Sequence, residues 1–183
     1  RRGVNGTIEV LTESLPQIGE DGMKLEYDTL LPSVLYVDGD EHNVGKVAKA
    51  MKSQSKNNVV SNSKNFIGQR DYKWTIGGKE YSPEMVESYF LSAVRKFLVD
   101  KYGAEDQIVS AVITVPASFD IDQRNSTKTA AKLAGFNGDI TLISEPTAAV
   151  LDFINEQSKL DDNDKYLDLS DFKNILVFDL GGG

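Results

Sequence analysis

The second half of the chain alternates between stretches typical of helices and stretches typical of strands, and this alternation limits the fold most strongly. Ser82 is a suitable N-cap, Pro83 suits a first helical position, and apolar residues then recur at helical spacing until Gly103. The elements predicted next are a strand, a helix that opens with a capping-box pair (Asp120 and Gln123), a strand, a helix and a final strand, at residues 108–115, 120–135, 140–143, 146–155 and 174–178. Such alternation predicts an α/β layer with a mainly parallel or mixed sheet.

The first 81 residues consist of shorter strand-like runs and turns. The expected features are an alternating run, a strand before a turn at Asp38-Gly39, a short helix, a polar stretch and a hairpin that closes at Gly77-Gly78, at residues 6–13, 33–37, 46–52, 52–65 and 71–82. Trp74 and Ile76 share one face of that hairpin.

Composition and charge exclude several classes of protein. The 28 Asp and Glu against 20 Lys and Arg give a net charge of -8, which argues against sequence-independent nucleic-acid binding. The absence of cysteine excludes a disulfide framework, a thiolate zinc site and a cysteine nucleophile. No apolar run approaches a membrane span, and Arg1-Arg2 leads into polar sequence. We therefore expect a soluble, cytoplasmic protein that binds neither nucleic acid nor membrane.

The sequence NILVFDLGGG, residues 174–183, has the chemistry of a phosphate and metal site. In an open α/β sheet, ligands bind beyond the carboxyl ends of the strands, and Asp179 follows a predicted strand. Its carboxylate could hold a hydrated Mg²⁺, while Gly181, Gly182 and Gly183 would let backbone N–H groups approach phosphate oxygens. The residues alone leave a second interpretation open, a glycine-rich turn in which Asp179 is a turn or capping residue.

Three motifs occur in a fixed order: VITVPASFDIDQR at 112–124, ISEPTAAVLDF at 143–153 and VFDLGGG at 177–183. With LLPSVLYV and KNFIG earlier in the chain, they resemble the N-terminal ATPase domain of the seventy-kilodalton heat-shock chaperone family, the DnaK type. The resemblance covers nearly the whole chain. It implies an actin-like, ribonuclease-H-like α/β lobe with a mixed sheet flanked by helices. The implied parts are a partial first subdomain, a smaller inserted α+β subdomain and the rest of the first subdomain, at residues 1–35, 36–81 and 82–183.

The resemblance also implies roles for single residues. Lys64 would reach the γ-phosphate and the attacking water, and Glu145 would orient water around Mg²⁺. Asp179 would belong to the Mg²⁺ shell, and Gly181, Gly182 and Gly183 would contact phosphate through backbone amides. Without the family pattern, Lys64 reads as a solvated lysine and Glu145 as a helix-start carboxylate favoured by the helix dipole.

Pro116 and Arg124 have a different implied role. In the family, such a proline and arginine belong to a relay that carries nucleotide state from the ATP site toward the rest of the chaperone. The residues themselves also allow plainer interpretations. Pro116 can be a strand terminator, and Arg124 can be an exposed helical arginine.

The implied function is that of a molecular chaperone that couples ATP binding and hydrolysis to the binding and release of unfolded peptide. Its expected ligands are ATP or ADP, Mg²⁺ and K⁺. Its expected partners are peptide clients held by a C-terminal domain, a nucleotide-exchange factor and a J-domain co-chaperone. Two other interpretations stay open: another ATPase of the actin and sugar-kinase superfold, and a divergent interaction module that does not hydrolyse ATP.

The chain departs from the family pattern at several positions. Thr141 stands where an arginine linked to J-domain contact is common, which puts that interface in doubt. The other departures are the serine of Ser144-Glu145-Pro146, Ala117-Ser118-Phe119 in place of A-Y-F, Asn65 in place of a basic residue, and a short segment at 68–81. In the family, a first phosphate hairpin would precede Arg1 and an adenosine-binding lobe would follow Gly183. Residues 1–183 alone are therefore expected to be inactive.

Two further groups of residues have no expected role in the chemistry. His42, the only histidine, falls in a charged turn, and we expect it to be a solvated turn residue. Asp161, Asp162 and Asp164 lack the full calcium-loop pattern and are expected to lie in a solvated loop.

Overall fold

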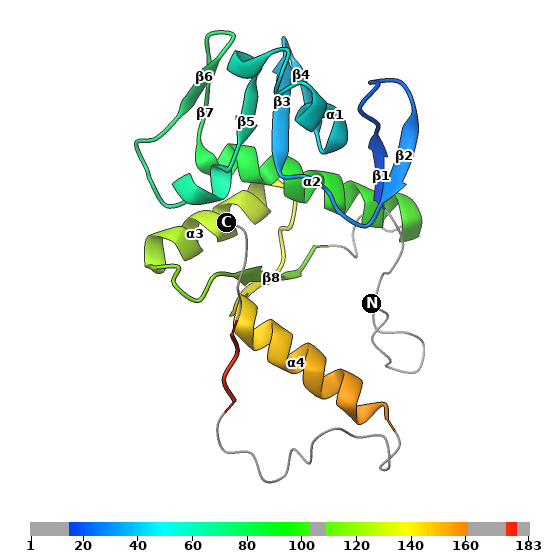
Figure 1. The fold of residues 1–183 in the computed structure, drawn as a ribbon. Helices are drawn as coiled ribbons and strands as arrows, with labels where there is room; N and C mark the ends of the chain where they lie inside the picture. The colour runs from blue at the N-terminus through cyan, green and yellow to red at the C-terminus, as the bar shows by residue number, and fades with distance from the viewer. Residues whose placement is uncertain (1–14, 103–108, 161–174, 179–183) are drawn as a thin grey trace.

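The longest helix lies across the middle of the described chain, between two groups of strands (Figure 1). The structure is a computed structural model that describes residues 15–102, 109–160 and 175–178. Its elements, in chain order, are β1 (Leu15–Ile18), β2 (Leu25–Asp28), β3 (Val34–Asp38), β4 (Glu41–Val44), α1 (Lys46–Ala50), η1 (Lys56–Asn58), β5 (Val59–Ser61), η2 (Ser63–Phe66), β6 (Trp74–Ile76), β7 (Lys79–Tyr81), α2 (Pro83–Tyr102), β8 (Ala111–Val115), α3 (Ile121–Leu133), β9 (Ile140–Ser144) and α4 (Glu145–Ser158).

The long helix α2 begins where the sequence predicts. The hydroxyl of Ser82 accepts a hydrogen bond from the Met85 amide at 3.3 Å, and the Ser82 carbonyl accepts one from the Val86 amide at 3.0 Å. Pro83 occupies the first position, where a missing N–H costs nothing. Within the described residues, no helix combines the length and the apolar character that a membrane crossing needs.

One face of α2 packs on the strands from the first half of the chain. β3 lies between β4 and β5 in an antiparallel sheet, and β6 and β7 form the expected hairpin around Gly77-Gly78. The buried residues shared by these strands and α2 are Leu35, Val37, Val60, Ile76, Tyr81, Val86 and Phe90. Burial of this apolar surface is what holds the short strands against the helix.

The other side of α2 contacts a parallel βαβ unit. β8 pairs in parallel with β9, from Ala111 opposite Ile140 to Val115 opposite Ser144, and α3 connects the two strands. The buried residues of this second core are Ala131, Ala134 and Phe136, and Leu91 of α2 packs against them. The predicted capping box of α3 is confirmed, because the Asp120 side chain accepts from the Gln123 amide at 2.8 Å and the Gln123 side chain accepts from the Asp120 amide at 3.0 Å.

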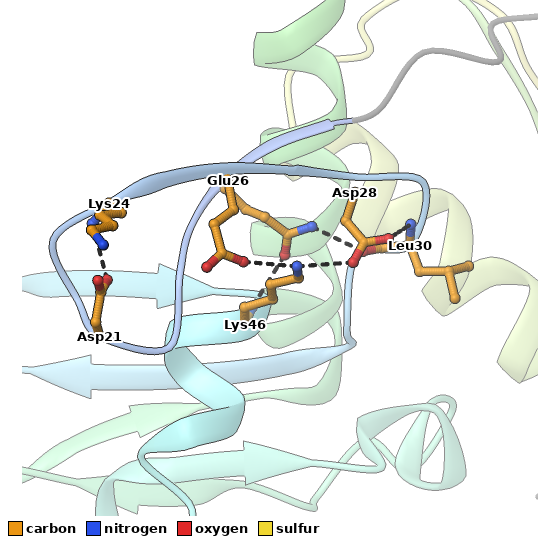
Figure 2. A network of polar contacts seen from close by, with 7 residues as sticks. Asp21, Lys24, Glu26, Asp28, Leu30 and Lys46 are labelled. Carbon is orange, nitrogen blue, oxygen red and sulfur yellow. Dashed lines mark hydrogen bonds and ion pairs between the residues drawn. The ribbon is translucent and has the colours of Figure 1, made fainter.

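The hairpin β1–β2 is fixed to α1 by a polar network (Figure 2). Lys46 Nζ lies 2.8 Å from Glu26 Oε2 and 3.0 Å from Asp28 Oδ2. Buried Gln17 donates to the Leu30 carbonyl at 2.9 Å and accepts from the Lys46 amide at 3.2 Å. Hydrogen bonds to the two carboxylates raise the pKa of Lys46, and the Lys46 ammonium lowers the pKa of Asp28.

The expectation of a mixed α/β fold is confirmed for the described residues, with differences in detail. The strands form several small sheets, in which β8 and β9 are parallel and the other pairs are antiparallel. β5 lies inside the stretch expected to be only polar, and the hairpin β1–β2 was not predicted. The last described helix, α4, runs from Glu145 to Ser158, longer than expected. The alternating run at 6–13 lies outside the described residues.

Two predictions are wrong. Residues 175–178 form no strand, and the side chains of Leu176 and Phe178 are 90% and 82% exposed. A strand needs a partner for its backbone hydrogen bonds, and the described partner of β8 is β9 alone. His42 is not a solvated turn residue, because it lies in β4 with Nε2 3.1 Å from the Tyr81 hydroxyl and its ring stacked on Tyr89 at 4.4 Å between centroids.

Candidate functional site

Lys64 and Glu145, 81 positions apart in the sequence, meet in the structure. Lys64 Nζ lies 2.8 Å from Glu145 Oε1. The two side chains are 56% and 39% exposed, so the pair faces solvent. An exposed ion pair of this kind contributes about 0 to 1 kcal/mol to stability, because water screens it. The pair therefore matters less for stability than for chemistry, because it places an ammonium and a carboxylate at one solvent-facing position.

Glu145 lies at the carboxyl edge of the parallel strand pair. It is the first residue of α4, directly after β9, and Ser144 caps the helix by accepting from the Thr147 amide at 3.3 Å. Because Val115 is opposite Ser144 in the register, Pro116 and Glu145 both follow the ends of neighbouring parallel strands. Ligands of open α/β sheets bind at this edge. The first turn of α4 also favours negative charge.

A cavity of about 170 Å³ lies beside Lys64. Its walls come from η2, α2, β8, the turn after β8 and α3, and they include Lys64, Glu87, Thr114, Pro116, Phe119 and Thr127. Two residues with separate implied roles, Lys64 and Pro116, thus line the same space.

Arg124 is connected to the turn that follows Pro116. The Arg124 Nε donates to the Phe119 carbonyl at 3.0 Å, and the Phe119 amide donates to the Pro116 carbonyl at 3.1 Å. Arg124 is half-buried, so it is not simply an exposed helical arginine. Pro116 does end a strand, since β8 stops at Val115. Pro116 therefore ends β8 and also lines the cavity beside Lys64.

The loop that carries Lys64 is attached to two helices. Gly68 has φ of 87°, and a Cβ built there would lie 2.9 Å from the backbone nitrogen of Gln123 in α3. Arg70 Nη2 lies 2.7 Å from Asp122 Oδ1 in the same helix. At the other end of the loop, the hydroxyl of Ser63 donates to Glu87 Oε1 of α2 at 2.7 Å. These contacts fix the path of the chain on both sides of Lys64.

Burial raises the pKa of the Glu87 carboxyl, although the Ser63 hydroxyl and the Lys64 charge act in the opposite direction. Glu87 belongs to a stripe on α2 with Pro83 and Phe90, both buried, at helical spacing. Glu87 and Ser63 were not identified from the sequence as residues of this site. A carboxylate inside an apolar helical stripe is the signal that could have identified Glu87.

The raised pKa of Glu87 predicts how this site responds to pH. Because the pKa of this carboxyl in the folded state lies above its ordinary 4.5, the protonated group stabilises the folded state at low pH. This contribution to stability is lost as the pH rises through the folded pKa. Glu87→Gln cannot ionise and so does not lose this contribution. We therefore expect its free energy of unfolding to increase relative to that of wild type as the pH rises from about 4 to about 7. Urea unfolding of both proteins at the two pH values measures the change, and a difference that does not vary with pH would contradict it.

The remaining sequence candidates are placed as follows. Thr141 lies on β9 opposite Val112, with its side chain exposed. Asp179 and Gly181, Gly182 and Gly183 lie outside the described residues, as do Asp161, Asp162 and Asp164. Among the residues that the structure describes, no cluster of three or more His, Cys, Asp or Glu side chains could hold a metal ion.

The sequence matches known proteins along most of its length. Residues 70–183 match the family model of the Hsp70 protein. The chaperone protein DnaK of Ureaplasma urealyticum serovar 10 is 39% identical over 179 residues, which cover 98% of this chain. The chain belongs to the Hsp70 family. A second relative, DnaK of Ureaplasma parvum serovar 3, is 37% identical over 179 residues and 98% of the chain.

This Hsp70 chain spans only 27% and 26% of the lengths of these two DnaK proteins. The match to the Hsp70 family model includes Pro116, Arg124 and Glu145, whereas Lys64 precedes it. The longer matches to DnaK cover nearly the whole chain. Family membership implies the actin-like ATPase fold, and the described residues have its mixed α/β character.

Proposed function

We propose that this Hsp70 chain is part of the nucleotide-binding domain of a molecular chaperone. That protein hydrolyses ATP and couples hydrolysis to the binding and release of unfolded peptide. The observation that supports this most is the meeting of Lys64 and Glu145 at the carboxyl edge of the parallel strands. The alternatives, another ATPase of the superfold and an interaction module, have no comparable support.

In the proposed site, Lys64 stabilises negative charge on the γ-phosphate and positions the attacking water. A flexible ammonium suits this role because phosphoryl transfer depends on positioning and charge stabilisation. Asp179 and the backbone amides of Gly181, Gly182 and Gly183 would complete the site.

The donor chemistry of Glu145 fits a hydrated Mg²⁺. Mg²⁺ takes oxygen ligands and keeps several of its waters, and Glu145 presents a partly exposed carboxylate. Glu145 would hold the ion through water, together with Asp179. When bound, Mg²⁺ neutralises charge on the phosphate oxygens. Glu145 also pairs with Lys64 and so restrains its ammonium.

For Pro116 and Arg124 we propose the role of a relay. Pro116 lines the same cavity as Lys64, and Arg124 holds the carbonyl of Phe119 in the turn that Pro116 opens. A displacement of the chain near Lys64 would therefore reach α3 through Pro116, Phe119 and Arg124. We also propose residues 36–81 as the inserted subdomain, between residues 1–35 and 82–183 of the first subdomain.

The proposed partners are those of a DnaK-type chaperone: unfolded peptide and a nucleotide-exchange factor. A J-domain co-chaperone is a further candidate, and the exposed Thr141 marks the position where its contact would differ. The proposed ligands are ATP or ADP with Mg²⁺, and K⁺ as a second ion.

We expect Glu145→Gln in the whole protein to lower the rate of Mg²⁺-dependent phosphate release by about 10- to 100-fold. This is the usual cost of losing a residue that orients metal-bound groups. The variant should also need more Mg²⁺ for half-maximal rate. Phosphate release measured over a series of Mg²⁺ concentrations gives both values.

Glu156→Gln is the matched control for this experiment. Glu156 is an exposed carboxylate on the same helix, and it also pairs with a lysine, Lys159, at 2.5 Å. Its replacement should leave the rate unchanged. Tight ATP binding without Mg²⁺-dependent phosphate release by the wild type would instead favour the interaction module.

A further inference from the structure

Glu87 is a carboxylate that the proposed chemistry does not use, although it lines the cavity beside Lys64. It comes from α2, and its Oε1 accepts a hydrogen bond of 2.7 Å from the hydroxyl of Ser63. Ser63 is 1% exposed and directly precedes Lys64. A partly buried serine–carboxylate contact therefore lies one residue from the ammonium that meets Glu145.

The segment around Lys64 depends on outside contacts for its position. η2 is a single short 3-10 helix, a structure with weak internal hydrogen bonding. Asn62, just before it, has φ of 59°, and it is the one non-glycine residue with positive φ in the described part of the chain. Asparagine adopts this left-handed conformation more readily than other non-glycine residues, and here it turns the chain into η2.

The contacts on the two sides of Lys64 come from different helices. After Lys64, Gly68 and Arg70 contact α3. Before Lys64, the bond from Ser63 to Glu87 attaches η2 to α2. Removal of the second attachment would leave the short helix η2 with one fewer constraint, on the side nearest to Lys64.

We propose that Glu87 is a positioning residue that acts through Ser63 to hold Lys64 against Glu145. Ser63 is buried and Lys64 is exposed, so the two neighbours in η2 point in different directions. Fixing Ser63 on α2 thus orients Lys64 toward α4. The consequence for hydrolysis rests on the proposed function, whereas the positioning itself does not.

The chemical reactivity of the Lys64 amine tests the positioning directly. In the whole protein, acetic anhydride labelling followed by mass spectrometry gives the modification rate of each lysine. We expect Glu145→Gln, Glu87→Ala and Ser63→Ala each to raise the Lys64 rate by about threefold, within the range that an exposed ion pair can supply. Glu87→Gln should retain a rate near wild type, because the amide oxygen can still accept from Ser63.

Lys79 is the internal control, because it forms an exposed ion pair with Asp40 away from this loop. An unchanged Lys64 rate in Glu87→Ala and Ser63→Ala, beside a raised rate in Glu145→Gln, would overturn the positioning role. So would an equal rise at Lys79, which would show only general loosening. The proposed function is tested separately: if Lys64→Ala does not slow hydrolysis, the catalytic role of Lys64 fails, and the labelling rates still decide the role of Glu87.

Discussion

Replacement of Lys64 by alanine in the whole protein should slow single-turnover ATP hydrolysis by about a thousandfold, the effect expected of a cation directed at the transferred phosphate. Nucleotide affinity should change little, because most binding contacts lie elsewhere in the proposed site. Loss of the ion pair with Glu145 should hardly affect folding, since both side chains face solvent. Rapid-quench measurement of one turnover separates the chemical step from product release.

Lys79→Ala is the matched control for this substitution. The Lys79 side chain is 54% exposed, close to the 56% of Lys64, and it also forms an ion pair with a carboxylate. Its removal should leave hydrolysis unchanged. Equal hydrolysis rates for wild type and Lys64→Ala would show that Lys64 is a solvated lysine with no catalytic role.

Gly68→Ala should lower the free energy of unfolding by about 3 kcal/mol, the sum of a strained backbone conformation and a displaced neighbour. Gly68 has φ of 87°, and the added Cβ would lie 2.9 Å from the Gln123 backbone nitrogen. That contact cannot be relieved by rotating a side chain. Because the loop also carries Lys64, hydrolysis in the whole protein should fall as well.

Gly78→Ala separates the two causes. Gly78 has a similar φ of 79°, but a Cβ there meets nothing within 4 Å. We therefore expect a loss of only about 1 kcal/mol from the backbone conformation. Urea unfolding of both variants gives the comparison, and equal losses would show that the loop moves away from α3 without cost.

The elements with local signals were predicted correctly. Ser82 and Pro83 start α2, Asp120 and Gln123 form a capping box, and Gly77-Gly78 close a hairpin. Each of these features depends on residues close together in the sequence, so its physical cause is visible there. The parallel pairing of β8 with β9 also follows, because a helix between two strands allows that direction.

The missed features depend on residues distant in the sequence. Val59 and Val60 lie among Asn and Ser, and only pairing with β3 makes them a strand. His42 is placed by Tyr81 and Tyr89, which come from elements much later in the chain. Hydrophobicity at 175–178 suggested a strand, but a strand forms only where its backbone groups pair with a neighbour, and these residues pair with no described strand.

The candidate site was predicted through the family resemblance more than through single residues. Lys64 lies in a polar stretch, and nothing local links it to Glu145. The family resemblance, carried by KNFIG around Lys64 and by ISEPTAAVLDF around Glu145, gave both residues roles at one ATP site, and the two side chains form an ion pair at 2.8 Å. Glu87 was missed because one carboxylate in an otherwise amphipathic helix is usually exposed.

The most direct test of the central claim, that Lys64 faces the terminal phosphate of bound ATP, is affinity labelling with an ATP acyl phosphate. This reagent transfers its acyl group to a lysine amine close to the terminal phosphate. In the whole protein with Mg²⁺, mass spectrometry should find the label on Lys64, and excess ATP should prevent it. Labelling of exposed lysines such as Lys79 and Lys96 without protection by ATP, and none at Lys64, would contradict the claim.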